Sequence, residues 1–349
     1  MRILNIMLAQ VRGGVETMAL RYHEAMRAAG LNVLSVGHKD GVLGTSLPAA
    51  EIAPEFAHVN ALVNHDPFAA LRIRAIARDF KPDLVLTHGN RATGIALLPF
   101  LGTAAKTVQV VHNFRHKGQI TRARAAICVS HSVHASLKAA YPDLPMYDIS
   151  NFGPLSERPV KPAPTAIPVL GTLARLHVNK GLDVAIRAIG LLKARGVPVI
   201  LRIAGEGPER AHLDALVRDN GVTDQVQFCG WVNEIAGYLN SLDLFVLPSR
   251  VEPFGLVVTE AMAAGAPVIA SRIDGPREIL RDGDLGTLSP KDDPAALADA
   301  IAAALADWPG VLDRARRAQA YALTHFSLEA GQARLKSVLN DIVQHRLAN

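Results

Sequence analysis

Two glutamates separated by seven residues, Glu252 and Glu260, have types and a spacing that could do chemistry. Glu252 lies in a loop after the apolar run 243–247, and Glu260 lies early in the helix predicted over 256–264. The free backbone N–H groups of residues 254–256, at the start of that helix, favour an anion. Carboxylates accept from sugar hydroxyls and amides hold phosphate oxygens, so the segment suits a nucleotide sugar. By spacing alone, an ordinary strand–helix unit with a solvated loop glutamate and a capping glutamate explains this pair of glutamates equally well.

Two cations form the second candidate group. Arg175 and Lys180 follow a predicted strand over 168–173 and precede a predicted helix over 181–195. Two positive charges at this position can neutralise a diphosphate, and fixed cations stabilise the charge that builds up on a leaving phosphate. The alternative is an ordinary surface arginine beside a lysine at a helix start.

The first part of the chain contributes glycines and a histidine. Gly13 and Gly14 lie where the predicted strand 3–9 turns into a helix, whose N-terminus can approach phosphate groups. His112 ends the predicted strand 107–112, which would place its ring at a strand's carboxyl end. The alternatives are a tight turn without a ligand and a histidine that serves only packing.

Other features are expected to carry no metal or cofactor. Asp282, Gly283 and Asp284 spell a metal-binding D-x-D sequence, but aspartate and glycine are also turn formers. Cys128 and Cys229 lack a C-x-x-C pattern, and we interpret both as isolated cysteines without a histidine cluster nearby. We therefore expect no disulfide, no zinc site and a reducing compartment, the cytoplasm. The sequence GEGPE at 205–209 lacks the full dinucleotide fingerprint.

The elements that must position these residues alternate between short apolar runs and amphipathic segments, a pattern typical of βαβ units. Further strands are predicted at 31–37, 84–88, 126–130, 198–204, 225–229, 243–247 and 267–270, and further helices at 67–79, 132–140, 208–219, 233–240, 294–306 and 311–345 with a break near 324–327. The Pro-rich stretch 151–168 is the best linker candidate. We expect two doubly wound α/β domains, 1–160 and 166–325, and a C-terminal helix over 326–349 that packs back towards the first domain.

Positive charge is concentrated in the first part of the chain. Residues 1–165 carry 18 Lys and Arg against 11 Asp and Glu, a net charge of +7, whereas residues 166–349 carry −2. The stretch 114–125 and the predicted helix bearing Arg72, Arg74 and Arg78 could contact an anionic membrane surface or a phosphorylated acceptor, or could be solvated only. No recognition motif for nucleic acid accompanies them, and we expect no such partner. No apolar run of about 20 residues predicts a membrane span.

The string E-P-F-G-L-V-V-T-E at 252–260 closely resembles the E-x7-E signature of the family-4 retaining glycosyltransferases, which have the GT-B fold of two facing Rossmann-like domains. Other stretches are similar to family motifs in the same order. They are the GG-x-E loop at 13–16, the Arg-x4-Lys-Gly element at 171–188, and the segments 201–210, 226–235 and 273–280.

The resemblance implies a role for each matching residue. Arg175, Lys180, Glu252 and His112 would be the catalytic residues, and Glu260 would hold the ribose. The remaining residues expected to bind the donor are Gly13, Gly14, Gly205, Trp231, Val232, Phe254, Gly255 and Leu256. The resemblance further implies no metal, no cofactor beyond a nucleotide-diphosphate sugar co-substrate (a UDP-sugar first), and retention by a front-face mechanism.

The acceptor implied by the resemblance is a polysaccharide, lipopolysaccharide or glycolipid bound by the first domain. Two alternatives stay open at this point. Non-hydrolysing sugar-nucleotide epimerases share the fold and the donor. A non-catalytic protein that binds nucleotide sugars would also keep the fold, although the presence of Arg175, Lys180, Glu252 and Glu260 argues against it.

Overall fold

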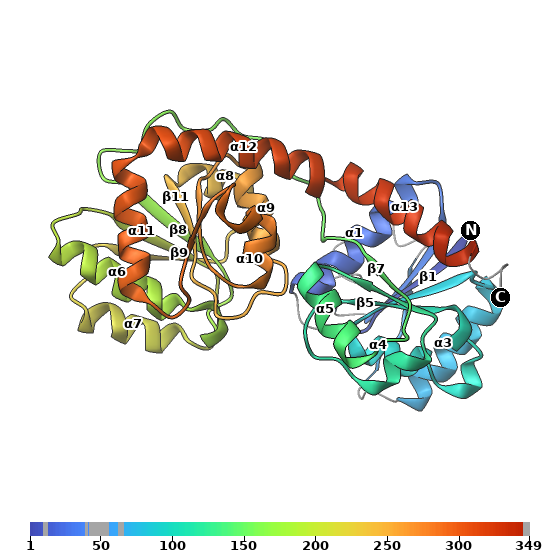
Figure 1. The fold of residues 1–349 in the computed structure, drawn as a ribbon. Coiled ribbons are helices and arrows are strands. Elements are labelled where there is room, and N and C mark those ends of the chain that lie inside the picture. The colour runs from blue at the N-terminus through green and yellow to red at the C-terminus, as the bar shows by residue number, and fades with distance from the viewer. Residues whose placement is uncertain (10–12, 39–40, 42–55, 62–65, 345–349) are drawn as a thin grey trace. The chain divides into compact units, whose positions relative to one another are not determined.

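The chain divides into two compact units in the computed structural model, which describes residues 1–9, 13–38, 41, 56–61 and 66–344 (Figure 1). Unit 1 comprises Met1–Gly153 with Ser327–Asn349, and unit 2 comprises Pro154–Phe326. The division after Gly153 lies a few residues before the boundary that the sequence suggests. Residue 345, where the last predicted helix ends, lies outside the described residues.

Unit 1 contains a seven-stranded parallel sheet of order β3-β2-β1-β4-β5-β6-β7 among its described residues. Its strands are β1 (Arg2–Met7), β2 (Asn32–Gly37), β3 (Phe56–His58), β4 (Leu84–His88), β5 (Thr107–Val111), β6 (Ala125–Cys128) and β7 (Met146–Asp148). Its helices are α1 (Gly14–Ala28), α3 (Pro67–Phe80), α4 (Gly89–Ala96), α5 (His131–Ala140) and α13 (Leu328–Gln344), with short 3₁₀ turns η1 (Pro99–Leu101), η2 (Ala104–Lys106) and η3 (Gly118–Arg122).

Unit 2 contains a six-stranded parallel sheet of order β10-β9-β8-β11-β12-β13. Its strands are β8 (Val169–Leu173), β9 (Ile200–Ala204), β10 (Val226–Gly230), β11 (Leu244–Leu247), β12 (Val268–Ser271) and β13 (Thr287–Ser289). Its helices are α6 (Leu182–Ala194), α7 (Arg210–Asp219), α8 (Ile235–Ser241), α9 (Leu256–Ala263), α10 (Asp274–Ile279), α11 (Pro294–Ala306) and α12 (Trp308–Phe326), with 3₁₀ turns η4 (Val178–Lys180) and η5 (Arg281–Gly283).

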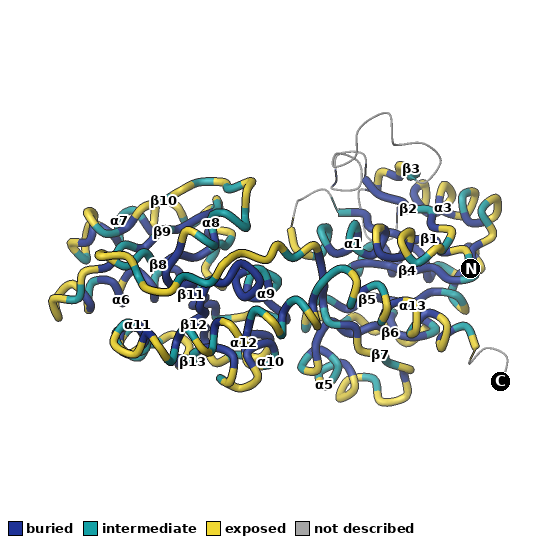
Figure 2. The backbone as a smooth tube through the Cα atoms, turned by 90° about the horizontal axis from the view of Figure 1, so that it is seen from above, coloured by how far each residue is buried: buried dark blue, intermediate teal, exposed yellow. Residues whose placement is uncertain are grey.

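Helices cover both faces of each sheet. The central strands are therefore continuous apolar runs and do not alternate between apolar and polar residues. Residues of β4, β5, β6, β11 and β12 are buried at every position. Figure 2 shows these strands buried along their length, while the helices alternate between buried and exposed residues. The predicted doubly wound α/β architecture is confirmed.

The strand order reverses beside the first strand of each sheet, where β1 pairs with β2 and β4 and β8 pairs with β9 and β11. In open parallel sheets, ligands bind outside the carboxyl ends of the strands at such a switch point. The residues that follow β1, β4, β8 and β11 are therefore the ones that the fold makes available to a ligand.

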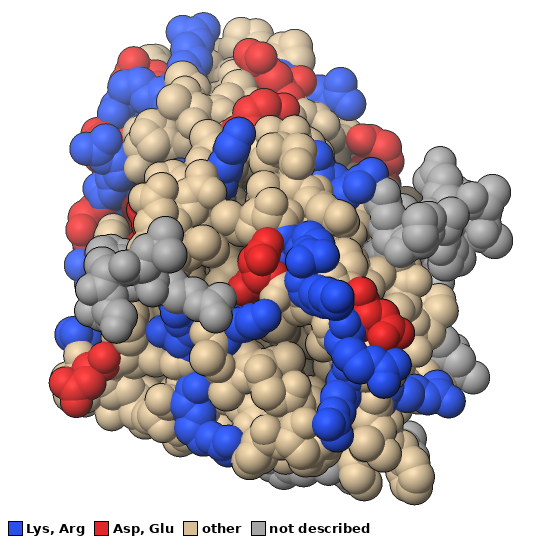
Figure 3. Space-filling view, turned by 90° about the vertical axis from the view of Figure 1, so that its right-hand side faces the viewer, with Lys and Arg blue, Asp and Glu red and all other residues tan. Residues whose placement is uncertain are grey.

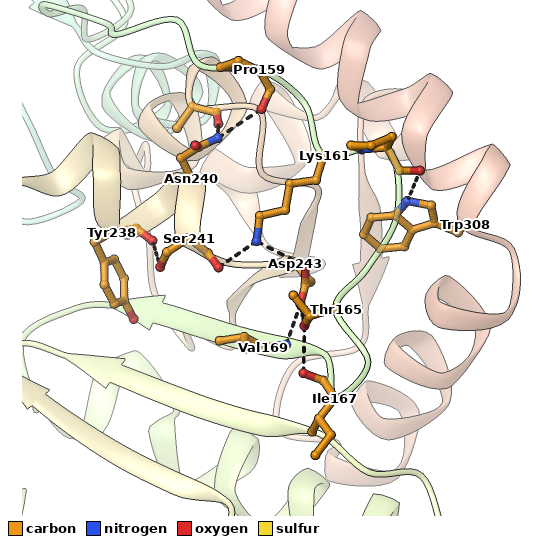
Figure 4. A network of polar contacts seen from close by, with 12 residues as sticks. Pro159, Lys161, Thr165, Ile167, Val169, Tyr238, Asn240, Ser241, Asp243 and Trp308 are labelled. Atoms are coloured by element: carbon orange, nitrogen blue, oxygen red, sulfur yellow. Dashed lines mark hydrogen bonds and ion pairs between the residues drawn. The ribbon is translucent and has the colours of Figure 1, made fainter.

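The Pro-rich stretch that the sequence predicts as a linker is held against unit 2 (Figure 4). The fully buried carboxylate of Asp243 accepts hydrogen bonds from Lys161 Nζ (3.2 Å), Thr165 Oγ1 (2.5 Å) and the backbone N–H of Val169 (2.8 Å). Trp308 Nε1 donates to the carbonyl of residue 162 at 3.2 Å. The later part of this stretch, from residue 161 onwards, is therefore part of folded unit 2, whereas residues 151–153 belong to unit 1.

The C-terminal helix α13 belongs to unit 1, where it packs on α1. Gly331 in α13 lies directly against the ring of Phe152, and Ser327 forms a bridge with Gly153. Among the described residues, no single helix is long and apolar enough to cross a membrane. The helices α11 and α12 reach that length and composition only together, and they meet at 97°.

Candidate functional site

A lysine and a glutamate lie in contact beyond the carboxyl ends of β8 and β11. Lys180 Nζ is 2.6 Å from Glu252 Oε2, and Ser249 Oγ is 3.4 Å from the same oxygen. Both charged side chains are partly exposed, so the pair is open to a ligand. The sequence predicted both residues as catalytic, and the fold brings them together from positions 72 residues apart.

An arginine that the sequence analysis missed holds the Lys180 loop in place. Arg250 donates two hydrogen bonds to the carboxylate of Asp183, at 2.8 and 2.9 Å, and a third to the carbonyl of Val178 at 2.6 Å. Asp292 lies 2.5 Å from its Nε. These carboxylates raise the pKa of Arg250, and the pKa of Asp183 is lowered, since the hydrogen bonds and charge of Arg250 outweigh partial burial. The loop that carries Lys180 is therefore braced by a bidentate ion pair.

The start of α9 presents backbone amides beside Glu252. Gly255 caps this helix with φ 110°, a conformation that residues with a Cβ rarely adopt. Phe254 is buried and Leu256 is half-buried, and the first N–H groups of a helix have no partner within the helix itself. Glu260 lies one helical turn further along α9 and is half-buried. Fixed N–H donors and a carboxylate thus lie on one short segment.

The loop after β9 comes close to the loop after β8. Gly205 has φ 125°, and a Cβ there would overlap the carbonyl oxygen of Ala174. Its N–H donates to the carbonyl of Gly230 at 2.7 Å, which joins this loop to the end of β10. Trp231 follows directly and is 62% exposed, and Val232 is half-buried. Gly205, Trp231 and Val232 therefore lie at neighbouring strand ends of unit 2.

Arg175 lies in the same unit, two residues after the end of β8, but its side chain is exposed and makes no ion pair within the part of the chain that the structure describes. An arginine that is not already paired is available to an anionic ligand. This contrasts with Lys180, whose charge is balanced by Glu252.

Unit 1 has its own cavity of about 380 Å³ at the carboxyl ends of β1, β4 and β5. Its volume falls in the range of about 300–1,000 Å³ that small-molecule pockets occupy. The polar residues lining it include His88, Asn90, Arg91, His112 and Arg115. The predicted residue His112 is therefore part of a pocket wall.

Two histidines in this pocket wall belong to a hydrogen-bonded chain that enters the core. His112 Nε2 lies 3.0 Å from His88 Nδ1, and His88 Nε2 lies 2.9 Å from Asn5 Oδ1. The Asn5 amide nitrogen donates to the carbonyl of Ala19 at 3.0 Å and to Ser35 Oγ at 3.1 Å. Asn5, Ser35 and His88 are buried.

The partners of this chain assign the tautomers of both rings. Since Asn5 Oδ1 can only accept, His88 carries its proton on Nε2 and accepts through Nδ1. His112 then donates from Nε2, and its Nδ1 is left as an acceptor. Burial lowers the pKa of His112 to about 3 and, together with the charge of His112, lowers that of His88 well below 6.5, so both rings are neutral at pH 7.

Gly13 and Gly14 lie at the N-terminus of α1, as predicted, and both are exposed. The carboxylate of Glu16 lies over this helix start, 2.9 Å from the position that a Cβ on Gly13 would take. Burial raises the pKa of Glu16. The first turn of α1 is therefore lined by glycines and by a carboxylate, and Glu16 also lines the cavity of unit 1.

The predicted site residues thus fall into two sets, one in each unit. Unit 1 holds Gly13, Gly14 and His112. Unit 2 holds Arg175, Lys180, Gly205, Trp231, Val232, Glu252, Phe254, Gly255, Leu256 and Glu260. Both sets lie beyond the carboxyl ends of strands beside a switch point.

The expectation that no histidine lies near the cysteines is wrong. Histidines do lie close to Cys128, because His131 and His134 follow it by three and six residues, and the structure brings Asp148 beside them. The D-x-D sequence forms a turn, in which Asp282 pairs with Arg277 and Asp284 pairs with an arginine of α12.

Comparisons with known proteins agree with this fold. The sequence model "Glycosyltransferase Family 4" matches residues 12–151, and "Glycosyl transferases group 1" matches residues 167–307. The lipopolysaccharide core biosynthesis glycosyltransferase LpsE of Rhizobium meliloti (strain 1021) is 28% identical over 242 residues, which are 68% of this chain and 69% of LpsE.

Two solved structures have a similar fold over nearly the whole chain. Anabaena Alr3699/HepE in complex with UDP has a TM-score of 0.82 at 20% identity and covers 98% of this chain and 100% of its own. Sucrose-phosphate synthase from Thermosynechococcus elongatus has a TM-score of 0.83 at 21% identity, with 99% of each chain covered.

Proposed function

Because this chain belongs to glycosyltransferase family 4 and has the GT-B fold, we propose that it transfers a hexose-type sugar, with retention, from a nucleotide-diphosphate sugar to an acceptor hydroxyl. A UDP-sugar is the first candidate donor, since the similar Anabaena protein is described in complex with UDP. A lipopolysaccharide, polysaccharide or glycolipid is the candidate acceptor, since LpsE is a lipopolysaccharide core glycosyltransferase.

The observation that carries this proposal is the contact between Lys180 and Glu252 beside the amide-bearing start of α9. Lys180 and the unpaired Arg175 supply positive charge for a diphosphate, and the amides supply N–H donors for its oxygens. In this proposal Glu252 would accept from hydroxyls of the transferred sugar, and Glu260 from those of the ribose. Gly205, Trp231 and Val232 line the ends of β9 and β10, where the base would lie.

The chemistry follows from charge. The bond between the anomeric carbon and the terminal phosphate oxygen breaks, and its electron pair stays on the diphosphate. Arg175, Lys180 and the α9 amides stabilise this growing charge more than they stabilise the bound donor, which accelerates the step. The acceptor oxygen bonds to the same face of the sugar, and its proton passes to the leaving phosphate oxygen. No metal ion takes part in this scheme.

A thermal-shift series with UDP, GDP, ADP and their sugars tests the donor. We expect UDP to raise the melting temperature of the wild-type protein and to raise it less in Glu260→Ala. The matched control is Glu329→Ala, which removes a carboxylate from α13 of unit 1. Equal stabilisation of wild type and Glu260→Ala would contradict the assignment.

A donor-only incubation separates transfer from its alternatives. An epimerase would release an altered nucleotide sugar without any acceptor, whereas a transferase releases free nucleotide and needs an acceptor for rapid turnover. If the nucleotide sugar stays intact both with and without a lipopolysaccharide acceptor, the protein only binds nucleotide sugars. Transfer is expected to need no added metal ion.

We further propose that α3 lets unit 1 contact an anionic membrane surface. Its side chains Phe68 and Leu71 are 78% and 53% exposed, and the exposed Arg72 and Arg74 lie beside them. Apolar side chains flanked by cations suit the interface of an anionic bilayer. Figure 3 shows Lys and Arg also gathered in a band at the end of unit 1 that carries the N-terminus.

Vesicle co-sedimentation tests this surface. We expect binding to vesicles of phosphatidylglycerol and phosphatidylcholine, none to phosphatidylcholine alone, and loss of binding in the double variant Phe68→Glu with Leu71→Glu. The control Ile167→Glu changes an apolar residue of unit 2 that is about as exposed as Leu71, and it should bind as wild type does. Equal binding to both kinds of vesicle would remove the charge argument.

A further inference from the structure

A cluster of metal-ligating side chains lies on unit 1, outside the residues used for transfer. Cys128 is the last residue of β6 and Asp148 is the last residue of β7, and the two are paired in the register of the sheet. His131 is the first residue of α5, which lies beside β7 (Figure 1), and His134 follows one turn later. Three separate elements therefore direct ligand atoms to one place.

The distances within this cluster are short. His134 Nδ1 lies 2.7 Å from Asp148 Oδ1, and His131 Nδ1 lies 3.4 Å from Asp148 Oδ2. The Sγ of Cys128, the Nδ1 of His134 and a carboxylate oxygen of Asp148 all lie within 4.8 Å of one another. Zinc bonds of about 2.0–2.3 Å in a tetrahedron place ligand atoms about 3.3–3.6 Å apart, so small side-chain adjustments would suffice.

The types of ligand indicate which ion fits. A thiolate, imidazoles and one carboxylate form the set that suits Zn²⁺ and its neighbours in the transition series, whereas Mg²⁺ and Ca²⁺ prefer oxygen ligands. Cys128 is fully buried, while His131 and Asp148 reach the surface, so the ion would sit at the rim of the core with an entry path. The spacing C-x2-H-x2-H at 128–134 is compatible with such a site.

We propose that Cys128, His134 and Asp148, with His131 as the fourth ligand, bind one zinc ion. Four protein ligands leave no open position for substrate, which is the arrangement of a structural site rather than a catalytic one. The ion would join β6, β7 and α5, and its binding would stabilise the folded protein. None of the four ligands takes part in the proposed transfer, so the two proposals are independent.

Cobalt titration of the untagged, chelator-treated full chain tests this site. Because Co²⁺ occupies zinc sites and absorbs light through a bound thiolate, we expect a thiolate–cobalt band that saturates at one equivalent and is displaced by Zn²⁺. The band should be absent in Cys128→Ser and Asp148→Asn and unchanged in Cys229→Ser, the exposed cysteine of unit 2. No band in the wild type, or an equal band in Asp148→Asn, would overturn the proposal.

A second measurement keeps the test decisive if Cys128→Ser does not fold. Asp148 and His134 are partly exposed, so Asp148→Asn and His134→Asn are expected to fold, as circular dichroism can check. Zn²⁺ should raise the melting temperature of wild type and Cys229→Ser but not of these two variants. UDP should still stabilise all of them, which separates this proposal from the proposed transfer.

Discussion

Lys180 and Glu252 form an ion pair in which Nζ lies 2.6 Å from Oε2, so a residue expected to neutralise a diphosphate is already neutralised. A bound diphosphate would compete with the carboxylate for the ammonium group. Glu252 would then be released towards the sugar as the donor arrives. Under the proposed function, the pair would therefore link binding of the diphosphate of the donor to the placement of Glu252 beside the sugar.

In the proposed reaction, replacing Lys180 by alanine would remove a charge that stabilises the transition state more than the ground state. We expect kcat to fall about 10²- to 10³-fold, with a smaller change in KM, in steady-state transfer assays. The control Lys193→Ala breaks a surface pair with Asp224 of similar length and should keep wild-type rates. A Lys180→Ala enzyme within twofold of wild type would refute the role.

Arg250 acts on Lys180 only through the loop that it braces. In Arg250→Lys the charge stays but the two parallel hydrogen bonds to Asp183 are lost, because lysine lacks the planar fork. We expect kcat/KM to fall about tenfold, for a loss of about 1.4 kcal/mol. The control Arg187→Lys alters an arginine that pairs with the same carboxylate through one bond, and it should leave kcat/KM unchanged. Equal losses in both variants would mean that Asp183 alone matters.

The tautomer of His112 should depend on His88. Nitrogen NMR of the wild-type imidazoles should show His112 protonated at Nε2 and bare at Nδ1. Removing the acceptor in His88→Leu should mix the tautomers and lower kcat, whereas the amide oxygen of His88→Gln should restore both. His23 lies beside Ser35, at the end of the hydrogen-bonded chain opposite His112, so His23→Gln should leave the His112 tautomer unchanged. An unchanged tautomer in His88→Leu would contradict the assignment.

Much of the fold follows from the sequence, because the central strands are apolar runs bounded by turn residues. The strands missed are β3, β7 and β13, each three residues long and at the edge of a sheet. Their half-buried residues give no periodic signal, so only pairing with a neighbour makes them strands. The division between the units does fall inside the predicted linker, but the packing of its later part on unit 2 could not be predicted for a related reason, since its anchor Asp243 lies some 80 residues away.

The candidate site divides in the same way. Glu252, Lys180 and His112 could be found because each follows a strand within a recognisable local pattern. Arg250 with Asp183, and His88 with Asn5, are pairs 67 and 83 residues apart, and nothing local marks either partner. Asn5 in particular sits inside an apolar strand, and only the pairing of β1 with β4 brings it within hydrogen-bonding distance of His88. Residues that position a site residue from a distant part of the sequence can therefore be identified only from the structure.

Stability in acid should reflect the buried histidines. Burial, with the charge of Arg27, lowers the pKa of His23 to about 4. Between pH 6.5 and 4 the unfolded chain therefore binds a proton that the folded chain does not. The free energy of unfolding should thus fall with falling pH, by up to about 1.4 kcal/mol per pH unit for this residue, and reach its full value above pH 6.5.

Urea unfolding of wild type and His23→Gln at pH 7, 6 and 5 measures this contribution. The variant should lose less stability between pH 7 and 5 than the wild type does. His325→Gln, which changes an exposed ring stacked on Tyr321, should follow the wild-type slope. Parallel slopes for wild type and His23→Gln would exclude the histidine as the source.

Asp243 should be among the most costly residues of unit 2 to remove. Its carboxylate is fully buried and balances Lys161 while accepting from Thr165 and the first residue of β8. Truncation in Asp243→Ala leaves those donors unpaired, and we expect a loss of about 3–5 kcal/mol in the free energy of unfolding. Asp224→Ala, which breaks an exposed pair, should cost under about 1 kcal/mol. Similar losses in urea unfolding for the two variants would show that the Pro-rich stretch is not anchored through this carboxylate.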